Sequence, residues 1–381
     1  MKTAVMYGAG NIGRGFIGQV LHDSGYEVAF IDVNMPVVEA LNERKAYTQL
    51  IVDENGTREV VIDNVRAVDG RVLDNVADEI ANCEVMATSV GAKVLRFIAP
   101  NIAEGIRRRA AAGRAPVNIL ICENLMDAAE YLHGLLDPCF AEDEKHLLEA
   151  TGLVEVVIGR MVPSMSPEMQ AGDITRIAVE PYCELPANKD CFKGEIPYVK
   201  YMIPFSPFAF FEERKLYIHN MGHAVCAYFG YLKGYNYICE AIADPEIYEK
   251  TSSAMLNSAR AISKHYGVDA KTLEDHVKEL LHRFTNKGLG DTVTRVGQDP
   301  MRKLMPKDRL IGAINRCHSE NENCDGILRA VAAALKFDVA TDNTAPELQK
   351  QLAEKGAEAF LTEYTGLGAE DVAKIVAYYN E

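Results

Sequence analysis

The chain has 381 residues, 48% of them hydrophobic, and a formal net charge of −15 at pH 7. This length fits two domains, and the negative charge argues against nucleic acid or an anionic membrane as a partner. Its nine cysteines include no Cys-x-x-Cys pair and no Cys/His cluster at zinc spacing, which indicates reduced thiols and no metal site. No apolar run is long enough to span a membrane, and the first strand begins without a leader. We therefore expect a cytoplasmic protein.

The first residues follow a strand, glycine turn, helix, strand pattern. A strand over 3–7 precedes Gly8-Ala9-Gly10-Asn11-Ile12-Gly13, a helical segment continues through residue 21, and a strand over 28–31 ends at Asp32. In this pattern Gly8 permits the turn, Gly10 lets the backbone approach a pyrophosphate and Gly13 lets the helix pack on the strand. The free N–H groups of the helix start bind phosphate, and the acid binds the adenosine ribose, favouring NAD over NADP. The alternative is a turn without ligand.

Two later strands also end in polar residues. Residues 83–87 run into Thr88-Ser-Val90-Gly91, and residues 117–122 run into Glu123-Asn124. Ligands of open α/β sheets lie beyond the carboxyl ends of the strands, so we expect Thr88 and Val90 to bind the cofactor and Asn124 to face the site. Capping of the next helix is the alternative for Asn124. Between extended runs over 47–52 and 59–62, Asn-Gly at 55–56 predicts a hairpin.

From residue 210 onward the pattern is helical. We expect an α/β Rossmann domain with a largely parallel sheet over residues 1–190, then an all-α domain over 191–381. Helices are predicted at 210–232, 236–242, 246–265, 271–285, 306–318, 324–337, 345–363 and 369–379.

The first of these helices carries a polar stripe of Lys215, Asn220 and His223. At 3.6 residues per turn the three lie within 140° of one another, and the small residues Ala227 and Gly230 on the same arc indicate a cleft. Lys215 could move a proton, Asn220 could donate to an alkoxide and His223 could orient the substrate oxygen. The alternatives are a solvated lysine and a hydrogen-bonded core histidine. His219 lies on the same arc, and we expect it to contact these residues and not the substrate.

Basic residues gather near residue 300, where Arg302, Lys303 and Arg309 predict a phosphate or carboxylate pocket. A solvated loop is the alternative. No tyrosine has a lysine four residues later, and zinc ligands are missing, which leaves lysine-based proton transfer as the dehydrogenase chemistry.

Four segments together resemble the polyol-specific long-chain dehydrogenases, the mannitol dehydrogenase family: residues 8–15, Cys122-Glu-Asn124, Glu213-Arg-Lys-Leu216 with Asn220-Met-Gly-His223, and residues 295–304. The resemblance implies a Rossmann domain followed by a helical one and no catalytic metal. It also implies that Lys215 is the acid/base, that Asn220 and Asn124 polarise the reacting oxygen, and that His223 helps to hold the substrate.

Within that family the chain is most similar to the phosphate-specific branch, which implies interconversion of mannitol 1-phosphate and fructose 6-phosphate. The segment Val157-Ile-Gly159-Arg160-Met-Val-Pro163 departs from the family's Asp-Arg-Ile-Val-Pro pattern. A hexuronate or a free polyol is therefore the alternative substrate, and an NAD-binding sensor without catalysis is the alternative function. The resemblance further implies a monomer or loose dimer.

Overall fold

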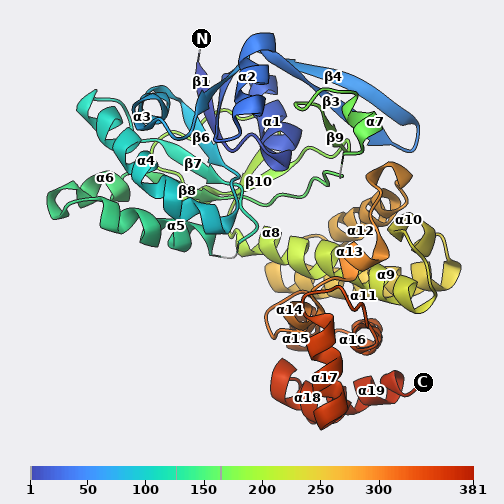
Figure 1. The fold of residues 1–381 in the computed structure, drawn as a ribbon. Coiled ribbons are helices and arrows are strands. Elements are labelled where there is room, and N and C mark those ends of the chain that lie inside the picture. Colours follow the sequence, from blue (N-terminus) through green and yellow to red (C-terminus); the bar gives the residue numbers. More distant parts are fainter. Residues whose placement is uncertain (1, 126, 164) are drawn as a thin grey trace. The chain divides into compact units, whose positions relative to one another are not determined.

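A computed structural model describes residues 2–125, 127–163 and 165–381. The chain forms two compact units that divide between Phe208 and Ala209 (Figure 1). The sequence placed this boundary near residue 190. The units divide later because β10 (Leu185–Asn188) and β11 (Met202–Phe205) pair with each other, and the start of β10 is buried in the core of the N-terminal unit.

The N-terminal unit is built on a six-stranded sheet with the order β5-β2-β1-β6-β7-β8, in which all neighbouring strands are parallel. This is the doubly wound order of dinucleotide-binding domains, with the ligand crevice at the carboxyl ends of β1 and β6 where the order reverses. The predicted fold is confirmed. The strands are β1 (Thr3–Tyr7), β2 (Glu27–Asp32), β5 (Val65–Asp69), β6 (Val85–Thr88), β7 (Asn118–Ile121) and β8 (Gly152–Glu155).

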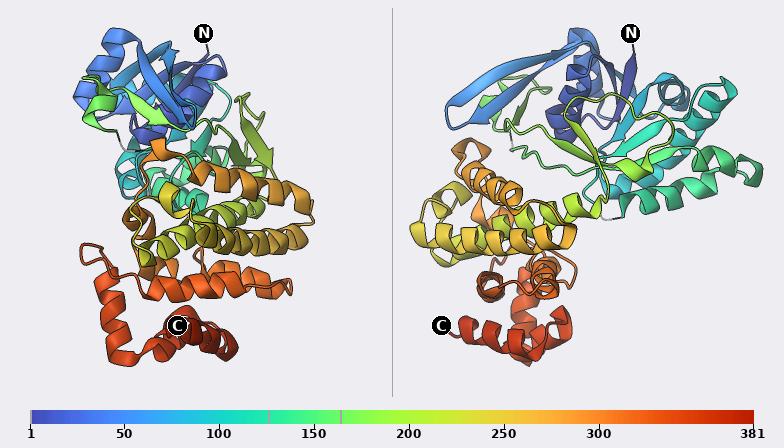
Figure 2. Two further views of the ribbon diagram at one scale, coloured as in Figure 1. Left: turned by 90° about the vertical axis from the view of Figure 1, so that its right-hand side faces the viewer. Right: turned by 180° about the vertical axis from the view of Figure 1, so that it is seen from behind.

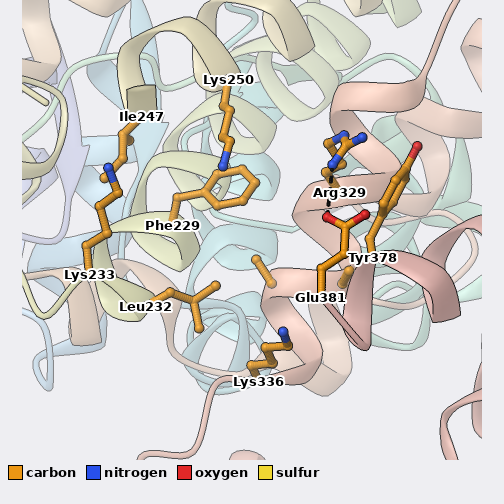
Figure 3. A pocket seen from close by; sticks show the side chains of 11 residues that line it. Phe229, Leu232, Lys233, Ile247, Lys250, Arg329, Lys336, Tyr378 and Glu381 are labelled. Atoms are coloured by element: carbon orange, nitrogen blue, oxygen red, sulfur yellow. Dashed lines mark hydrogen bonds and ion pairs between the residues drawn. The ribbon is translucent and has the colours of Figure 1, made fainter. Parts of the chain in front are cut away.

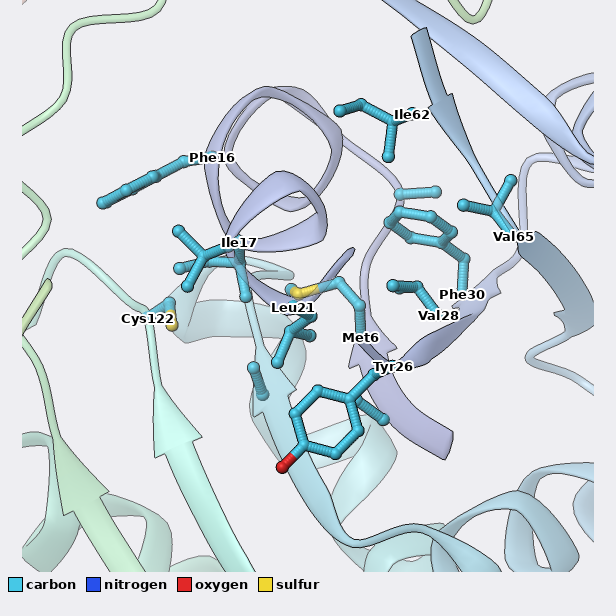
Figure 4. Close-up of a cluster of buried hydrophobic side chains, with 14 of the residues drawn as sticks. Met6, Phe16, Ile17, Leu21, Tyr26, Val28, Phe30, Ile62, Val65 and Cys122 are labelled. Carbon is cyan, nitrogen blue, oxygen red and sulfur yellow. The ribbon is translucent and has the colours of Figure 1, made fainter. Parts of the chain in front are cut away.

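Both faces of this sheet are covered, because successive strand residues point to opposite sides and both sets are apolar. On one face Met6 and Phe30 pack with Phe16 and Leu21 (Figure 4). The helical elements are a π-helical segment, called here the first π-turn (Gly13–Ile17), α1 (Gly18–Asp23), α2 (Met35–Arg44), α3 (Leu73–Asn82), α4 (Ala92–Ala111), α5 (Ala128–Leu136), α6 (Lys145–Glu149) and α7 (Pro167–Gln170).

A second, three-stranded sheet has the order β4-β3-β9. The predicted hairpin is present: β3 (Ala46–Asp53) and β4 (Gly56–Asp63) are antiparallel and joined through residues 54–55. Strand β9 (Ile177–Val179) joins β3 in parallel. This sheet supplies two side chains, described below, that contact the first π-turn.

The C-terminal unit is helical apart from an isolated β-bridge between Tyr237 and Thr292, and two views of it are given in Figure 2. Its first helix covers the predicted span as α8 (Ala209–Glu213), a π-helical segment called the second π-turn (Arg214–Asn220), and α9 (Met221–Leu232). The remaining helices are α10 (Ile238–Ala241), α11 (Pro245–Tyr266), α12 (Ala270–Phe284), α13 (Val293–Gly297), α14 (Pro300–Lys303), α15 (Ile311–Ser319), α16 (Asp325–Leu335), α17 (Ala345–Lys355), α18 (Ala357–Thr365) and α19 (Ala369–Tyr379).

One predicted helix, 345–363, is in fact two, α17 and α18. The break falls at Gly356, whose φ of +79° is a conformation that glycine adopts without strain. Among the described residues, no helix combines the length and the apolar character that crossing a membrane requires.

Candidate active site

The glycine turn after β1 has three glycines with three different surroundings. Gly8 has a φ of +105°, and a Cβ there would overlap the carbonyl oxygen of Ser89. A Cβ on Gly13 would overlap the carbonyl oxygen of Gly8. A Cβ on Gly10 would meet nothing within 4 Å, so the exposed backbone of Gly10 faces open space. Gly8 and Gly13 are thus required by the fold, whereas Gly10 leaves room for a ligand.

Asp32, at the end of β2, holds this turn in place. Its Oδ2 accepts a hydrogen bond from the backbone N–H of Ala9 at 2.7 Å, and its Oδ1 accepts one from Asn34 N–H at 2.9 Å. Each carboxylate oxygen can accept a second hydrogen bond, so Asp32 retains capacity for the two hydroxyls of a ribose. Asn11 is exposed and Ile12 half-buried at the start of the following helix.

The first π-turn is stabilised by side chains from distant parts of the chain. The carbonyl oxygen of Arg14 accepts hydrogen bonds from Tyr47 Oη at 2.7 Å and Gln49 Nε2 at 2.6 Å, both on β3. The carbonyl oxygen of Gly15 accepts from Arg160 Nη1 at 3.0 Å. Insertion of such donors into the helical hydrogen-bond ladder is a recognised cause of local distortion.

Arg14 itself is buried and ties the glycine turn to the segment before β9. Its Nε donates to the Ala9 carbonyl at 2.6 Å, and its Nη1 donates to the Thr175 carbonyl. Burial lowers the pKa of this guanidinium. Sequence analysis gave Arg14 no role, although it lies inside the glycine motif.

The ends of β6 and β7 are joined by Glu123. Its two carboxylate oxygens accept hydrogen bonds from the backbone N–H groups of Val90 at 2.9 Å and Gly91 at 2.8 Å. Thr88 is fully buried, and its Oγ1 has no hydrogen-bond partner within the described ranges. Asn124 is exposed on the loop after β7. The sequence placed Glu123 at this strand end without a role, and the structure shows that it shapes the loop carrying Val90.

In the C-terminal unit, the second π-turn changes the geometry of the predicted stripe. A π-helix bonds residue i to residue i+5, so Asn220 lies about one turn beyond Lys215. The separation of 140° expected from an ordinary α-helix is therefore wrong for this pair. Short π-helical stretches are frequent at functional sites because they redirect side chains.

His219 contacts Lys215 directly. Lys215 Nζ lies 3.0 Å from His219 Nδ1, and His219 is only 4% exposed. Burial, and then the nearby charge of Lys215, lower the pKa of His219 well below its ordinary value. The imidazole is therefore neutral at physiological pH and offers Nδ1 as an acceptor to the lysine.

His223 is held between an aromatic ring and a carboxylate. Its ring stacks on Phe284 with centroids 4.7 Å apart and planes 13° apart, and its Nε2 lies 3.5 Å from Asp291 Oδ2. That distance is a close approach and is too long for a strong hydrogen bond. Burial, followed by the charge of Arg295, lowers the pKa of His223 well below its ordinary value. Sequence analysis missed Phe284 and Asp291, because only the tertiary fold brings them to this helix.

The small residues Ala227 and Gly230 pack against other helices and do not line the predicted cleft. A Cβ on Gly230 would come within 2.8 Å of Ala241 Cβ and 3.2 Å of Val293 Cγ2. Ala227 is fully buried. Both positions therefore permit close packing against neighbouring helices, and the cleft inferred from them is not supported.

Lys303 is the most unusual member of the predicted basic segment. It is 2% exposed and donates to the Gln298 carbonyl oxygen. Burial, and then the charges of Arg309 and Arg302, lower the pKa of Lys303 to about 7. A buried amine with cationic neighbours is stabilised by an incoming anion.

The two arginines of this segment are paired with acids. Arg302 Nε donates to Asp299 Oδ2 at 2.7 Å, and Arg309 Nε donates to Asp308 Oδ1 at 2.8 Å. The charges of Lys215, Arg309 and Lys303 all contribute to lowering the pKa of His223. The structure thus brings the predicted basic segment and the predicted stripe into one electrostatic region.

A pocket of about 240 Å³ lies at the opposite end of α9 from the second π-turn (Figure 3). Phe229 and Leu232 line it together with Lys250 and Arg329. Arg329 is engaged by Glu381 at 3.4 Å and lies 3.8 Å from the centre of the Tyr378 ring. None of the residues predicted to be functional lines this pocket.

Comparison with known proteins adds the family. Residues 2–200 match the family model of the mannitol dehydrogenase Rossmann domain, and residues 208–379 match that of the mannitol dehydrogenase C-terminal domain. A Bacillus velezensis protein named mannitol-1-phosphate 5-dehydrogenase is 38% identical over 96% of this chain and 95% of its own length. A Bacillus subtilis protein of the same name is 37% identical over 97% and 96%.

Solved structures agree on the fold. A substrate-free D-sorbitol dehydrogenase gives a TM-score of 0.83 at 16% identity, covering 100% of this chain and 93% of its own. The ternary complex of Pseudomonas fluorescens mannitol 2-dehydrogenase with NAD and D-mannitol gives 0.75 at 16% identity, covering 100% and 91%. The two family models between them span nearly the whole sequence, and the chain belongs to the mannitol dehydrogenase family.

Proposed function

We propose that this protein is an NAD-dependent dehydrogenase that interconverts D-mannitol 1-phosphate and D-fructose 6-phosphate. Two observations in the C-terminal unit carry the proposal: Lys215 contacts His219, and the charges of Lys215, Arg309 and Lys303 all help to lower the pKa of the neighbouring His223. The names of the curated relatives, at 36–38% identity over nearly the whole chain, support the same substrate pair.

NAD fits the N-terminal unit. The open space beside Gly10 admits a pyrophosphate, and the Asp32 carboxylate has lone pairs for the ribose hydroxyls while repelling a 2′-phosphate. The loop of Thr88 and Val90, held by Glu123, borders the same strand ends. When bound, NAD supplies the acceptor for the hydride that leaves the alcohol carbon.

Lys215 is proposed as the acid/base. In the oxidation direction its amine takes the hydroxyl proton, and in the reduction direction its ammonium returns that proton to the ketone oxygen. The neutral His219 ring, 3.0 Å away, accepts a hydrogen bond from Nζ and so fixes where the lysine points. His219 is therefore a positioning residue in this scheme.

Amide and imidazole groups are proposed to polarise the reacting oxygen. Asn220 follows Lys215 by one π-helical turn, and its amide can donate to the oxygen on which negative charge develops. Asn124 is proposed to donate from the loop after β7. His223, neutral and stacked on Phe284, offers a ring N–H to a substrate hydroxyl.

The phosphate is proposed to bind at Arg302, Lys303 and Arg309. Burial, and then repulsion by Arg309 and Arg302, lower the pKa of Lys303, and a phosphate dianion beside the ammonium would offset both effects. Binding should therefore be accompanied by proton uptake near neutral pH.

Substrate preference tests the proposal. NADH oxidation should be fast with fructose 6-phosphate and slow with fructose or fructuronate. Arg309→Ala should raise KM for fructose 6-phosphate about 10- to 100-fold, since a charged hydrogen bond contributes about 1.5–3 kcal/mol, and should leave the slow fructose rate unchanged. Arg260→Ala, an exposed arginine on α11, is the matched control. Equal or better turnover of an unphosphorylated ketose or hexuronate would overturn the substrate assignment.

A further inference from the structure

Three side chains of different chemistry meet at the end of the C-terminal unit, on elements that the proposed dehydrogenase site does not use. They are His318 on α15, Cys324 immediately before α16, and Asp371 in the first turn of α19. One ligand atom from each lies within 4.8 Å of the other two. His318 Nε2 is 2.7 Å from Asp371 Oδ2 and 3.8 Å from Cys324 Sγ.

Two of the three side chains are buried and the third is half-exposed, an arrangement that would let a metal ion enter. Cys324 is 5% exposed and Asp371 is 7% exposed, whereas half of the His318 side chain is exposed. Two ligands are thus fixed by packing, and the third can rotate by small amounts to close on an ion. The open side leaves room for a water molecule as fourth ligand, as at three-ligand zinc sites.

We propose that His318, Cys324 and Asp371 bind one Zn²⁺ ion. A thiolate, an imidazole and a carboxylate together select a borderline-soft ion over Mg²⁺ or Ca²⁺, which prefer oxygen ligands. The thiolate and the carboxylate neutralise the two charges of the ion. No metal site was predicted from the sequence, because the three residues lie on α15, before α16 and on α19 and follow no zinc spacing.

Without a metal the Cys324 thiol stays protonated. Burial and the Asp371 charge raise the pKa of Cys324 to about 11. A bound divalent ion reverses this preference, because a coordinating thiol is deprotonated. Metal binding at this site should therefore release about one proton per ion.

The ion would join α15 and the loop that precedes α16 to the first turn of α19. Helices α16 and α19 already pack on each other. The bound ion adds a link that the unfolded chain lacks, so it should stabilise the folded C-terminal unit. It has no part in hydride or proton transfer, and removing it should leave turnover at 25 °C unchanged.

Cobalt provides the test, because a thiolate bound to Co²⁺ gives an intense near-ultraviolet charge-transfer absorption. The protein of residues 1–381, treated with EDTA and desalted, is titrated with CoCl₂ and then with ZnCl₂. We expect one equivalent of Co²⁺ to produce the band, Zn²⁺ to abolish it by displacement, and MgCl₂ to have no effect. Zn²⁺ should also raise the Tm in the wild type.

Variants assign the band to the cluster. Cys324→Ser should lose the band. His318 is half-exposed, so His318→Gln should leave the fold intact. It should weaken Co²⁺ binding by at least about tenfold, because even the loss of a residue that only supports a metal ligand has an effect of this size. Cys239→Ser on α10 and His265→Gln on α11 are matched controls and should titrate like the wild type. The absence of the band, or its survival in Cys324→Ser, would overturn the proposal.

Discussion

The first and second π-turns share the same backbone irregularity, but they differ in the groups that surround them. At the first, donors from elsewhere in the chain bind the carbonyls of Arg14 and Gly15, and the exposed backbone of Gly10 precedes it. At the second, the irregular segment carries Lys215 and His219, whose side chains are in contact. The proposed cofactor-binding part therefore depends on open space beside a glycine as well as on Asp32, whereas the proposed acid/base part depends on side-chain chemistry throughout. Substitutions should affect the two parts differently.

Loss of the acid/base should have the largest effect. Lys215→Ala should lower kcat by about 10²- to 10⁴-fold, the usual contribution of general acid–base catalysis, with little change in the KM for NADH. Steady-state NADH oxidation with fructose 6-phosphate measures both. Lys271→Ala, an exposed lysine on α12, is the control. A variant that is folded and retains most of its kcat would remove Lys215 from the chemistry.

Substitutions of two glycines in the turn should distinguish an effect on NADH binding from an effect on stability. Gly10→Ala should leave the Tm unchanged, because the added methyl meets no protein atom, and should raise the KM for NADH about tenfold or more by obstructing the pyrophosphate.

Gly8→Ala is the counterpart at the same turn. Its positive φ and the overlap with the Ser89 carbonyl should cost about 1–3 kcal/mol of stability. Thermal unfolding and NADH titration of both variants distinguish the two roles. Unchanged NADH affinity in Gly10→Ala would contradict the proposed approach of the pyrophosphate.

A further expected effect is the pH-dependent loss of stability caused by the buried Lys303. The folded pKa of Lys303 is about 7, below the value of about 10.4 for an unfolded lysine, so between these values the unfolded chain binds more protons. The destabilisation is complete below pH 7 and disappears as pH rises toward 10.4. In the absence of substrate, Lys303→Met should therefore be more stable than the wild type by a margin that shrinks by about 2 kcal/mol between pH 7 and 9.

Urea unfolding at several pH values measures this margin. The exposed Lys307→Met in the same segment should show no such pH dependence. A margin that is constant with pH would mean that Lys303 is charged in the folded state throughout this range.

The predictions were most accurate where the residues that determine a structure lie close together in the sequence. The glycine turn, β1 and the placed Asp32 are contiguous or nearly so, and the alternating pattern gave the parallel sheet. The span of the first C-terminal helix was also close, because the apolar residues that give its periodicity, such as Ile218 and Met221, are buried.

The errors arose where geometry depends on distant partners. An assumed period of 3.6 residues cannot reveal a π-turn, and so the relation of Lys215 to Asn220 was wrong. The contact of His223 with Asp291, and of Arg160 with the first π-turn, joins residues far apart in the chain and leaves no local signal. Gly230 was assigned to a cleft because a small residue for helix packing and one for ligand access look identical in sequence.

The second π-turn also bears on attempts to engineer a more heat-resistant protein. Substitutions chosen to favour regular α-helix across 214–220 would strengthen local hydrogen bonding and rotate α9 relative to α8. His223 would turn with α9, although no proposed functional residue had been replaced. Any stabilisation programme should therefore leave these seven residues untouched and draw its gains from helices such as α17 and α18.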